Sequence, residues 1–447
     1  MSLPRPVRFI CTIAIFSALV FVLTFGGNLH AQQKFENQDL DRSRQMLRDA
    51  YDTVKKHYYD AKFHGLDWDA RFHQYDEQMK TATSLGDSFS IIADFLGGLK
   101  DSHTFFIPPA RPFHIDYGYR FQMIGAAAFV TRVRPGTDAE SKVHPGDQIA
   151  AINKVRLTRA TAWQLNYLLN GLSPQPQTQL FIHDGNGENR PVDILSKAKG
   201  TKKIVNLTGS DGGTDMWQYI RDAQNEDHTV RQRWVELEDV MVWKMPEFDL
   251  PDGEVDRIFG IARKHKALVL DLRGNPGGAV DTLDRMLANV FDHDVKVGDL
   301  TGREKLKPQV AKGSVRNVFS GKLVVLIDSD SASAAELFAR VIQLEHRGTV
   351  IGDISSGSVM EARRYESSLG MDTKIFYSFS VTDADVIMQD GKSLERSGVT
   401  PDEISLPTAE DIAKQRDPVL AHAVELVSGK LDPTSAGKLF PFEWVAF

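Results

Sequence analysis

The sequence predicts a largely parallel α/β sheet as the core, preceded by a helical region and a compact β-rich module. Between residues 239 and 406, short apolar strands alternate with helices, and such crossovers give mostly parallel strands. Residues 32–99 show apolar residues at helical spacing. Residues 116–198 contain short alternating strands separated by Pro/Gly turns. We therefore expect a helical domain at 32–115, a β-rich domain at 116–198, a linker or insertion at 199–238 and the α/β core at 239–447.

The first 31 residues have the pattern of a secretory signal peptide. Arg5 and Arg8 precede an apolar run over residues 9–25, and Ala31 is the small residue expected at a cleavage site. We expect a secreted or periplasmic protein; the alternative is an uncleaved segment that anchors the chain to a membrane. The only cysteine, Cys11, lies inside this segment, so the mature chain is expected to have no disulfide.

Composition narrows the range of partners. The chain has 447 residues and a net charge of −7, and its basic residues are not clustered on any one element. Nucleic acid is therefore not an expected partner. The sequence contains no metal-ligand spacing and no phosphate-binding or dinucleotide-binding fingerprint, so we predict no metal and no cofactor.

The expected elements follow in chain order. In the β-rich region we predict strands at 127–134, 148–152 and 178–183, with a helix at 161–169. In the core we predict strands at 240–245, 267–272, 323–327 and 349–351, and helices at 252–265, 280–291 and 334–342. Ligands of such sheets bind at the carboxyl ends of the strands.

Two turns at these strand ends attract attention. Ser333 lies where the strand 323–327 gives way to a helix; it can act as a helix cap or as a nucleophile. Gly277 and Gly278 follow another strand, either as a plain turn or as a place where the backbone approaches substrate. With the N–H of Ala334, their N–H groups form a candidate oxyanion hole. His103, in a turn before residues 105–107, is a candidate base, although a lone histidine is often only a surface or packing residue.

In the β-rich module, Gly118 precedes Tyr119 and Phe121. We interpret this stretch as a candidate loop for a peptide carboxylate, with an added peptide strand as the mode of recognition.

Several motifs in this order resemble the S41 serine peptidases, which include the carboxyl-terminal processing (tail-specific) and tricorn-type enzymes. They are DLRGNPGG at 271–278, SASAAE at 331–336, Gly352 and GVTPD at 398–402. The resemblance covers most of the mature chain and implies a ClpP/crotonase-like core. Residues 117–149 are similar to the family's PDZ domain, and residues 57–68 and 99–104 to its helical N-terminal domain.

The resemblance implies roles for individual residues. The family's nucleophile falls on Ser333, and its oxyanion hole on Gly277, Gly278 and Ala334. The lysine base of the processing peptidases is replaced by Ser358. Tricorn-type members instead use a Ser-His pair and a Glu, which are matched by Ser102, His103 and Glu395.

We therefore expect an exported serine peptidase that cleaves proteins or peptides, recognised through their C-termini, with His103 as the base and Ser102 or Glu395 orienting it. Two alternatives remain. The same fold occurs in proteins that bind peptides or apolar ligands without cleavage. A lysine base could also be displaced to Lys374 or Lys392.

Overall fold

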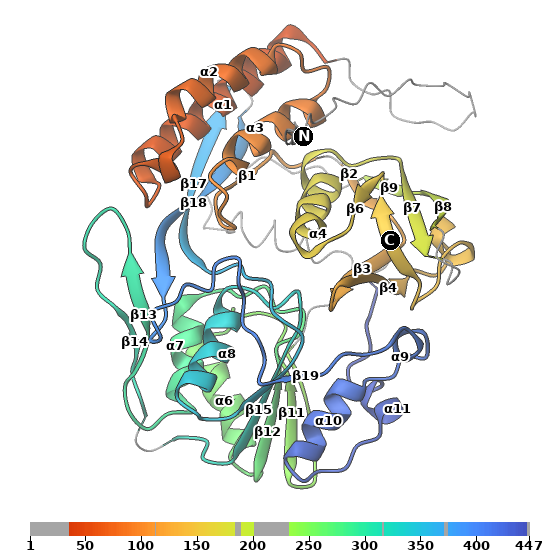
Figure 1. Ribbon diagram of the computed structural model, residues 1–447, viewed down its shortest axis with the longest axis vertical. Helices are drawn as coiled ribbons and strands as arrows, with labels where there is room; N and C mark the ends of the chain where they lie inside the picture. Colours follow the sequence, from red (N-terminus) through yellow and green to blue (C-terminus); the bar gives the residue numbers. More distant parts are fainter. Residues whose placement is uncertain are drawn as a thin grey trace, which may run out of the picture.

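The computed structural model describes residues 35–111, 113–183, 189–200, 232–314, 317–370 and 374–444. The predicted signal peptide lies outside these residues. Figure 1 shows a helical region at the top, a β-rich module beside it and a larger α/β core below. Within the described part of the chain, no helix is long and apolar enough to cross a membrane.

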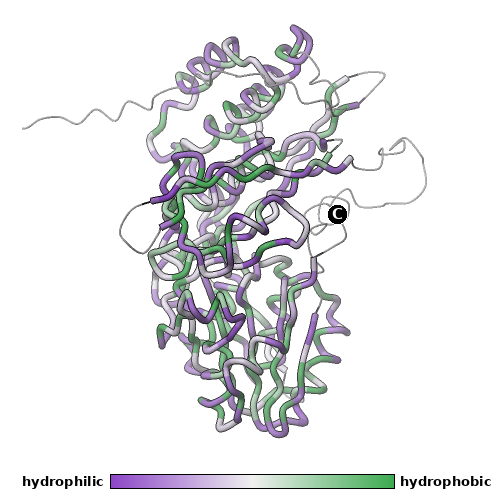
Figure 2. The backbone as a smooth tube through the Cα atoms, turned by 90° about the vertical axis from the view of Figure 1, so that its right-hand side faces the viewer, coloured by the Kyte–Doolittle hydropathy of each residue, from purple (hydrophilic) through white to green (hydrophobic). Residues whose placement is uncertain are grey.

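Three helices form the top of the molecule: α1 (Asn37–His57), α2 (Trp68–Met79) and α3 (Leu85–Gly97). Side chains cap two of them, since Asp67 accepts the Ala70 N–H and Ser84 accepts the Asp87 N–H. In Figure 2 these helices alternate between hydrophilic and hydrophobic colours along their turns, which is typical of helices with one buried side. The predicted N-terminal helical region is confirmed.

The β-rich module is an antiparallel sheet of order β3-β4-β5-β7-β8, with β6 paired to β5. Its strands are β3 (Tyr119–Ile124), β4 (Ala127–Val133), β5 (Gln148–Ile152), β6 (Val155–Arg156), β7 (Gln177–His183) and β8 (Asn189–Leu195). Helix α4 (Arg159–Asn166) continues into a π-helical segment, Tyr167–Leu172. A separate pair joins β2 (Phe113–Asp116) to β9 (Lys197–Gly200).

The core sheet has the order β10-β11-β12-β15-β16-β19, and every pair except β10–β11 is parallel. The strands are β10 (Arg233–Leu237), β11 (Val240–Lys244), β12 (Ala267–Asp271), β15 (Lys322–Ile327), β16 (Thr349–Gly352) and β19 (Glu403–Ile404). One face packs against α6 (Asp252–Ala262), α7 (Val280–Ala288) and α8 (Ala334–Leu344). The other face packs against α10 (Pro418–Leu426) and α11 (Pro433–Ala436), with the short α9 (Ala409–Ala413) preceding them. The predicted, largely parallel sheet is confirmed.

The segment 199–238 is not a linker throughout. Its last residues form β10, which pairs with β11 in the core sheet, so this sheet begins before residue 239. Arg233–Leu237 carries charged residues among apolar ones and is partly exposed along its length, as an edge strand is, and the preceding Gly/Asp-rich stretch obscured it. The middle of the predicted linker lies outside the described residues.

A second sheet joins the helical region to the core. Its order is β1-β18-β13-β14, with β17 also paired to β18. The strands are β1 (Phe105–Ile107), β13 (Val295–Thr301), β14 (Gln309–Ala311), β17 (Met360–Leu369) and β18 (Ile375–Ile387). The first half of β18 packs among the N-terminal helices and its end packs in the core, so this long strand fixes β1 relative to the core.

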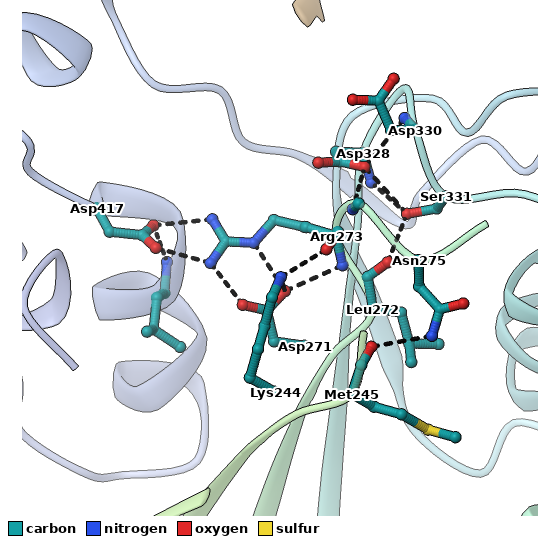
Figure 3. A network of polar contacts seen from close by, with 12 residues as sticks. Lys244, Met245, Asp271, Leu272, Arg273, Asn275, Asp328, Asp330, Ser331 and Asp417 are labelled. Carbon is teal, nitrogen blue, oxygen red and sulfur yellow. Dashed lines mark hydrogen bonds and ion pairs between the residues drawn. The ribbon is translucent and has the colours of Figure 1, made fainter. Parts of the chain in front are cut away.

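A buried ion network holds the end of β12 (Figure 3). Arg273 donates to both carboxylate oxygens of Asp271 and of Asp417, and Lys244 lies 3.2 Å from Asp271. These cations lower the pKa of the buried Asp271 against the effect of desolvation. Because Asp417 also caps α10, the network ties that helix to the strand end that precedes the Gly277 turn.

Candidate active site

Ser333 stands at the junction of β15 and α8 with a strained backbone. Its φ of 53° is uncommon for a residue with a side chain, and such strain is frequent at active sites. The buried Ser331 helps to fix the turn, because its hydroxyl donates to the Leu272 carbonyl oxygen at 2.8 Å (Figure 3).

The Gly277-Gly278 turn lies directly against Ser333. A Cβ on Gly277, whose φ is 98°, would come within 2.6 Å of the Ser333 Cβ, so only glycine fits this approach. The backbones are also joined, because the Ala332 N–H donates to the Asn275 carbonyl oxygen at 2.9 Å.

The three predicted oxyanion donors are not equivalent. The Gly277 N–H donates to the side-chain oxygen of Asn275 at 2.8 Å and is therefore occupied. Asn275 is buried and held by the Met245 carbonyl oxygen, which fixes this arrangement. The N–H groups of Gly278 and Ala334 donate to no atom of the described residues. The structure thus leaves Gly278 and Ala334 as the pair available to an oxyanion.

His103 is half-buried, and the hydroxyl of Ser102 links its ring to the carboxylate of Glu395. Ser102 Oγ lies 2.7 Å from His103 Nδ1 and donates to Glu395 Oε2 at 2.8 Å. Because a hydroxyl has one proton and an ionised carboxylate only accepts, Ser102 accepts from His103 Nδ1–H. This assignment leaves Nε2 of His103 unprotonated, as a general base requires.

The turn that bears His103 is fixed to β18. Asp101 Oδ1 accepts the N–H groups of His103 and Thr104, and it also accepts the Thr382 hydroxyl at 2.8 Å. Burial lowers the pKa of His103, and the nearby Asp101 charge opposes this effect. The imidazole is therefore neutral at pH 7.

One peptide unit connects Glu395 to Ser333. The carbonyl oxygen of Ser358 accepts the Ser333 N–H at 2.9 Å, and the N–H of the next residue, Val359, donates to Glu395 Oε2 at 3.0 Å. The structure therefore brings Ser333, Ser102, His103 and Glu395 into one constellation from distant parts of the sequence. No direct hydrogen bond joins the His103 ring to Ser333 Oγ among the described residues; in unliganded enzymes such contacts are often longer than in the substrate complex.

Glu336 is a site residue that the sequence reasoning left without a role. It is fully buried and accepts the N–H groups of Ser333, Gly357 and Ser358 and the Ser355 hydroxyl. Burial raises its pKa to about 7, and the four donors oppose that rise. The spacing S-x-x-E at the start of α8 is the signal that marks it. Glu336 thus fixes the 355–358 segment to the first turn of α8.

The remaining predicted residues lie elsewhere. Lys374 and Lys392 are exposed, so neither has the desolvated surroundings that a lysine base requires. Gly118 and Tyr119 are buried within the β-rich module, and the Gly118 N–H donates to Asp116 at 2.7 Å rather than facing a ligand. Phe121 packs at the edge of the same core. A carboxylate-binding role for this loop stays a prediction that the geometry does not favour.

The described residues contain no group of His, Cys, Asp and Glu side chains placed to hold a metal ion. The constellation itself offers a hydroxyl, an imidazole and a carboxylate, together with the free backbone N–H groups. This set is the one required for acyl transfer by a serine nucleophile.

Comparison with known proteins agrees with this geometry. Residues 239–405 match peptidase family S41, and residues 41–97 match the tricorn protease C1 domain. The chain belongs to peptidase family S41. The S41 match spans β11 to β19 and thus includes Ser333, the Gly277-Gly278 turn and Glu395; the C1 match covers the helices before His103.

Two curated relatives of this S41 protein represent the two types. It is 25% identical over 347 residues to the tail-specific protease of Haemophilus influenzae, covering 72% of this chain and 46% of that protein. It is 24% identical over 408 residues to the putative tricorn protease homolog 2 of Streptomyces coelicolor, covering 85% of this chain and 32% of that protein. The chain spans less than half the length of these relatives.

Solved structures share the fold. Mature CPAF superposes with a TM-score of 0.61 at 15% identity, covering 84% of this chain and 94% of that one. The photosystem II D1 C-terminal processing protease superposes with a TM-score of 0.52 at 17% identity, covering 89% and 99%. The chain therefore shares its fold with both of these proteins.

Proposed function

We propose that this S41 protein hydrolyses peptide bonds, with Ser333 as nucleophile and His103 as general base. The observation that carries the proposal is the hydrogen-bonded series His103–Ser102–Glu395, which shares the Ser358–Val359 peptide with Ser333. Ser102 and Glu395 orient the imidazole, and Glu395 stabilises the imidazolium that forms when Nε2 takes the Ser333 proton.

The reaction balances without a cofactor. Ser333 Oγ attacks the scissile carbonyl carbon, and the negative charge that develops on its oxygen meets the N–H groups of Gly278 and Ala334. The imidazolium then gives its proton to the leaving amine, and an acyl-enzyme remains on Ser333. Water, deprotonated by His103, hydrolyses the ester and regenerates the hydroxyl.

Several features support a histidine base. Ser358 occupies the position of the lysine of the processing peptidases and cannot accept a proton at neutral pH. An imidazole is neutral at pH 7 without the strong desolvation that a lysine base requires. The match to the tricorn C1 domain before His103 is consistent with this choice.

The substrates we propose are proteins or peptides recognised near their C-termini, as the name of the tail-specific relative suggests. We also propose export, because residues 1–31 have the pattern of a signal peptide. N-terminal sequencing of the protein recovered from the periplasm or medium tests export, with Gln32 as the expected first residue.

The test of activity compares wild type with Ser333→Ala on casein and on unstructured peptides. Hydrolysis by wild type alone supports the proposal. Equal hydrolysis by both proteins would refute Ser333 as the nucleophile. If neither protein hydrolyses these substrates but both bind the peptides, the binding alternative replaces the enzyme. Matched peptides with free and amidated C-termini test the proposed recognition of the terminal carboxylate.

A further inference from the structure

Helix α4 of the β-rich module and the π-helical segment that continues it carry one stripe of residues, which contacts the segment before Ser358 and the strand after His103. Arg159, Trp163 and Tyr167 are spaced four residues apart, so they lie on one side of the helix. The other side, with Ala162, Leu165 and Leu169, packs in the core of the module. Figure 1 shows α4 on the side of the module that faces the rest of the chain.

The first end of this stripe contacts the segment that leads to Ser358. Arg159 lies 2.7 Å from an oxygen of Asp353 and donates to the Ile354 carbonyl oxygen at 2.8 Å. Ser358 follows in the same segment, and its carbonyl oxygen accepts the Ser333 N–H. The start of α4 is thereby fixed to the segment whose Ser358 carbonyl oxygen accepts the Ser333 N–H.

The other end contacts the strand that follows His103. The Tyr167 hydroxyl donates to the Phe106 carbonyl oxygen in β1. Phe105, two residues after His103, lies with its ring centroid 6.2 Å from that of Tyr167 and 6.4 Å from that of Trp163, both edge to face. The stripe is therefore tied at one end to the segment that leads to Ser358 and at the other end to the strand that follows His103.

Trp163 lies between these two anchors and is 49% exposed. Its indole stacks on the Tyr167 ring at 5.4 Å and meets the edge of Phe105, so the ring is held in place although half of its surface is open. A fixed, exposed aromatic ring offers a large apolar surface with little conformational entropy to lose on binding.

We infer that Trp163, supported by Phe105, forms the wall of a substrate subsite that takes a large apolar or aromatic side chain close to the scissile bond. The inference rests on the proposed function, because it assigns a specificity to that same site. Trp163 acts by contact with the substrate and moves no proton. It selects among peptides and is not needed for the chemistry itself.

The test uses two internally quenched peptides that differ only in whether the residues flanking the scissile bond are Phe and Leu or Ala and Ser. The ratio of their kcat/KM values is measured for wild type, Trp163→Ala and Trp163→Phe. We expect Trp163→Ala to lower the preference for the apolar peptide about ten-fold, with the effect mainly in KM, and Trp163→Phe to restore most of it. Leu195→Ala is the matched control, since Leu195 is 54% exposed on β8, an edge strand of the module's sheet, and we expect its ratio to equal that of wild type.

Two further measurements separate this inference from the proposed function. Reaction of Ser333 with a fluorophosphonate shows that the catalytic groups of each variant are intact. Affinities of the two peptides for Ser333→Ala, with and without Trp163→Ala, measure the same preference without turnover. A loss of preference in the double variant supports the subsite even if wild type proves inactive. An unchanged ratio in Trp163→Ala, or no binding of either peptide to Ser333→Ala, would overturn the inference.

Discussion

The Ser333 N–H lies 2.9 Å from the carbonyl oxygen of Ser358. Ser358, the residue that we expect at the lysine position of the processing peptidases, thus binds the proposed nucleophile through its backbone, while its hydroxyl lies 2.9 Å from that of Ser356. The group that we expect to remove the Ser333 proton therefore lies in the Ser102–His103 turn.

Because only the backbone of Ser358 has a role, Ser358→Ala is expected to change kcat/KM by no more than about two-fold. Hydrolysis of a fluorogenic peptide measures this. A loss of two orders of magnitude would instead make the Ser358 hydroxyl part of the catalytic machinery.

Glu395→Gln is expected to lower kcat about 10²–10⁴-fold with little change in KM. The amide places an NH₂ group where the carboxylate accepts from Ser102 and Val359, so the Ser102 hydroxyl loses its acceptor and the tautomer of His103 is no longer fixed. Glu366→Gln is the control, because Glu366 is an exposed carboxylate on β17. Equal activity of the two variants would remove Glu395 from the proposed mechanism.

The acid side of the pH profile is expected to report His103. The neutral imidazole is the active form, and burial lowers the pKa of His103 below the ordinary value of 6.5. As the pH falls, kcat/KM should therefore stay high to pH 6.5 and decline only below it. A decline centred near pH 7 would instead identify Glu336, whose pKa burial raises to about 7, as the controlling group.

Asp417→Ala is expected to lower the free energy of unfolding by roughly 2–4 kcal/mol. The change leaves the partly buried Arg273 with one carboxylate partner fewer and removes the cap of α10. Chemical denaturation measures the loss. Glu410→Ala breaks an exposed ion pair with Lys414 and should cost far less; equal losses would mean that the network around Arg273 contributes nothing.

The sequence predicted best those strands and helices that have their own apolar periodicity. The predicted strand at 323–327 and helix at 334–342 correspond to β15 and α8, and the strand at 349–351 corresponds to β16. Apolar runs bounded by polar turns specify such elements on their own. Ser333 and Gly277 could be proposed as site residues from the sequence, because each follows a strand that its apolar run identifies.

Long-range pairing could not be derived in this way. The sequence reasoning missed the β17–β18 hairpin, whose strands carry polar and charged residues on their half-exposed sides. It therefore could not place Phe105 opposite Ser380, the pairing that fixes the His103 turn relative to the core. Nor could spacing show that Asn275 occupies the Gly277 N–H, because that bond depends on the folded turn.

The rate at which a fluorophosphonate labels Ser333 tests the central claim most directly, because only an activated serine reacts. Labelling is followed by mass spectrometry in wild type, His103→Gln and His144→Gln, the last an exposed histidine in the β-rich module, with Ser333→Ala to confirm the labelled residue. We expect wild type and His144→Gln to be labelled on Ser333 at the same rate and His103→Gln at least about 100-fold more slowly. Equal labelling of wild type and His103→Gln, or no labelling of wild type, would contradict a nucleophile at Ser333 that is activated by His103.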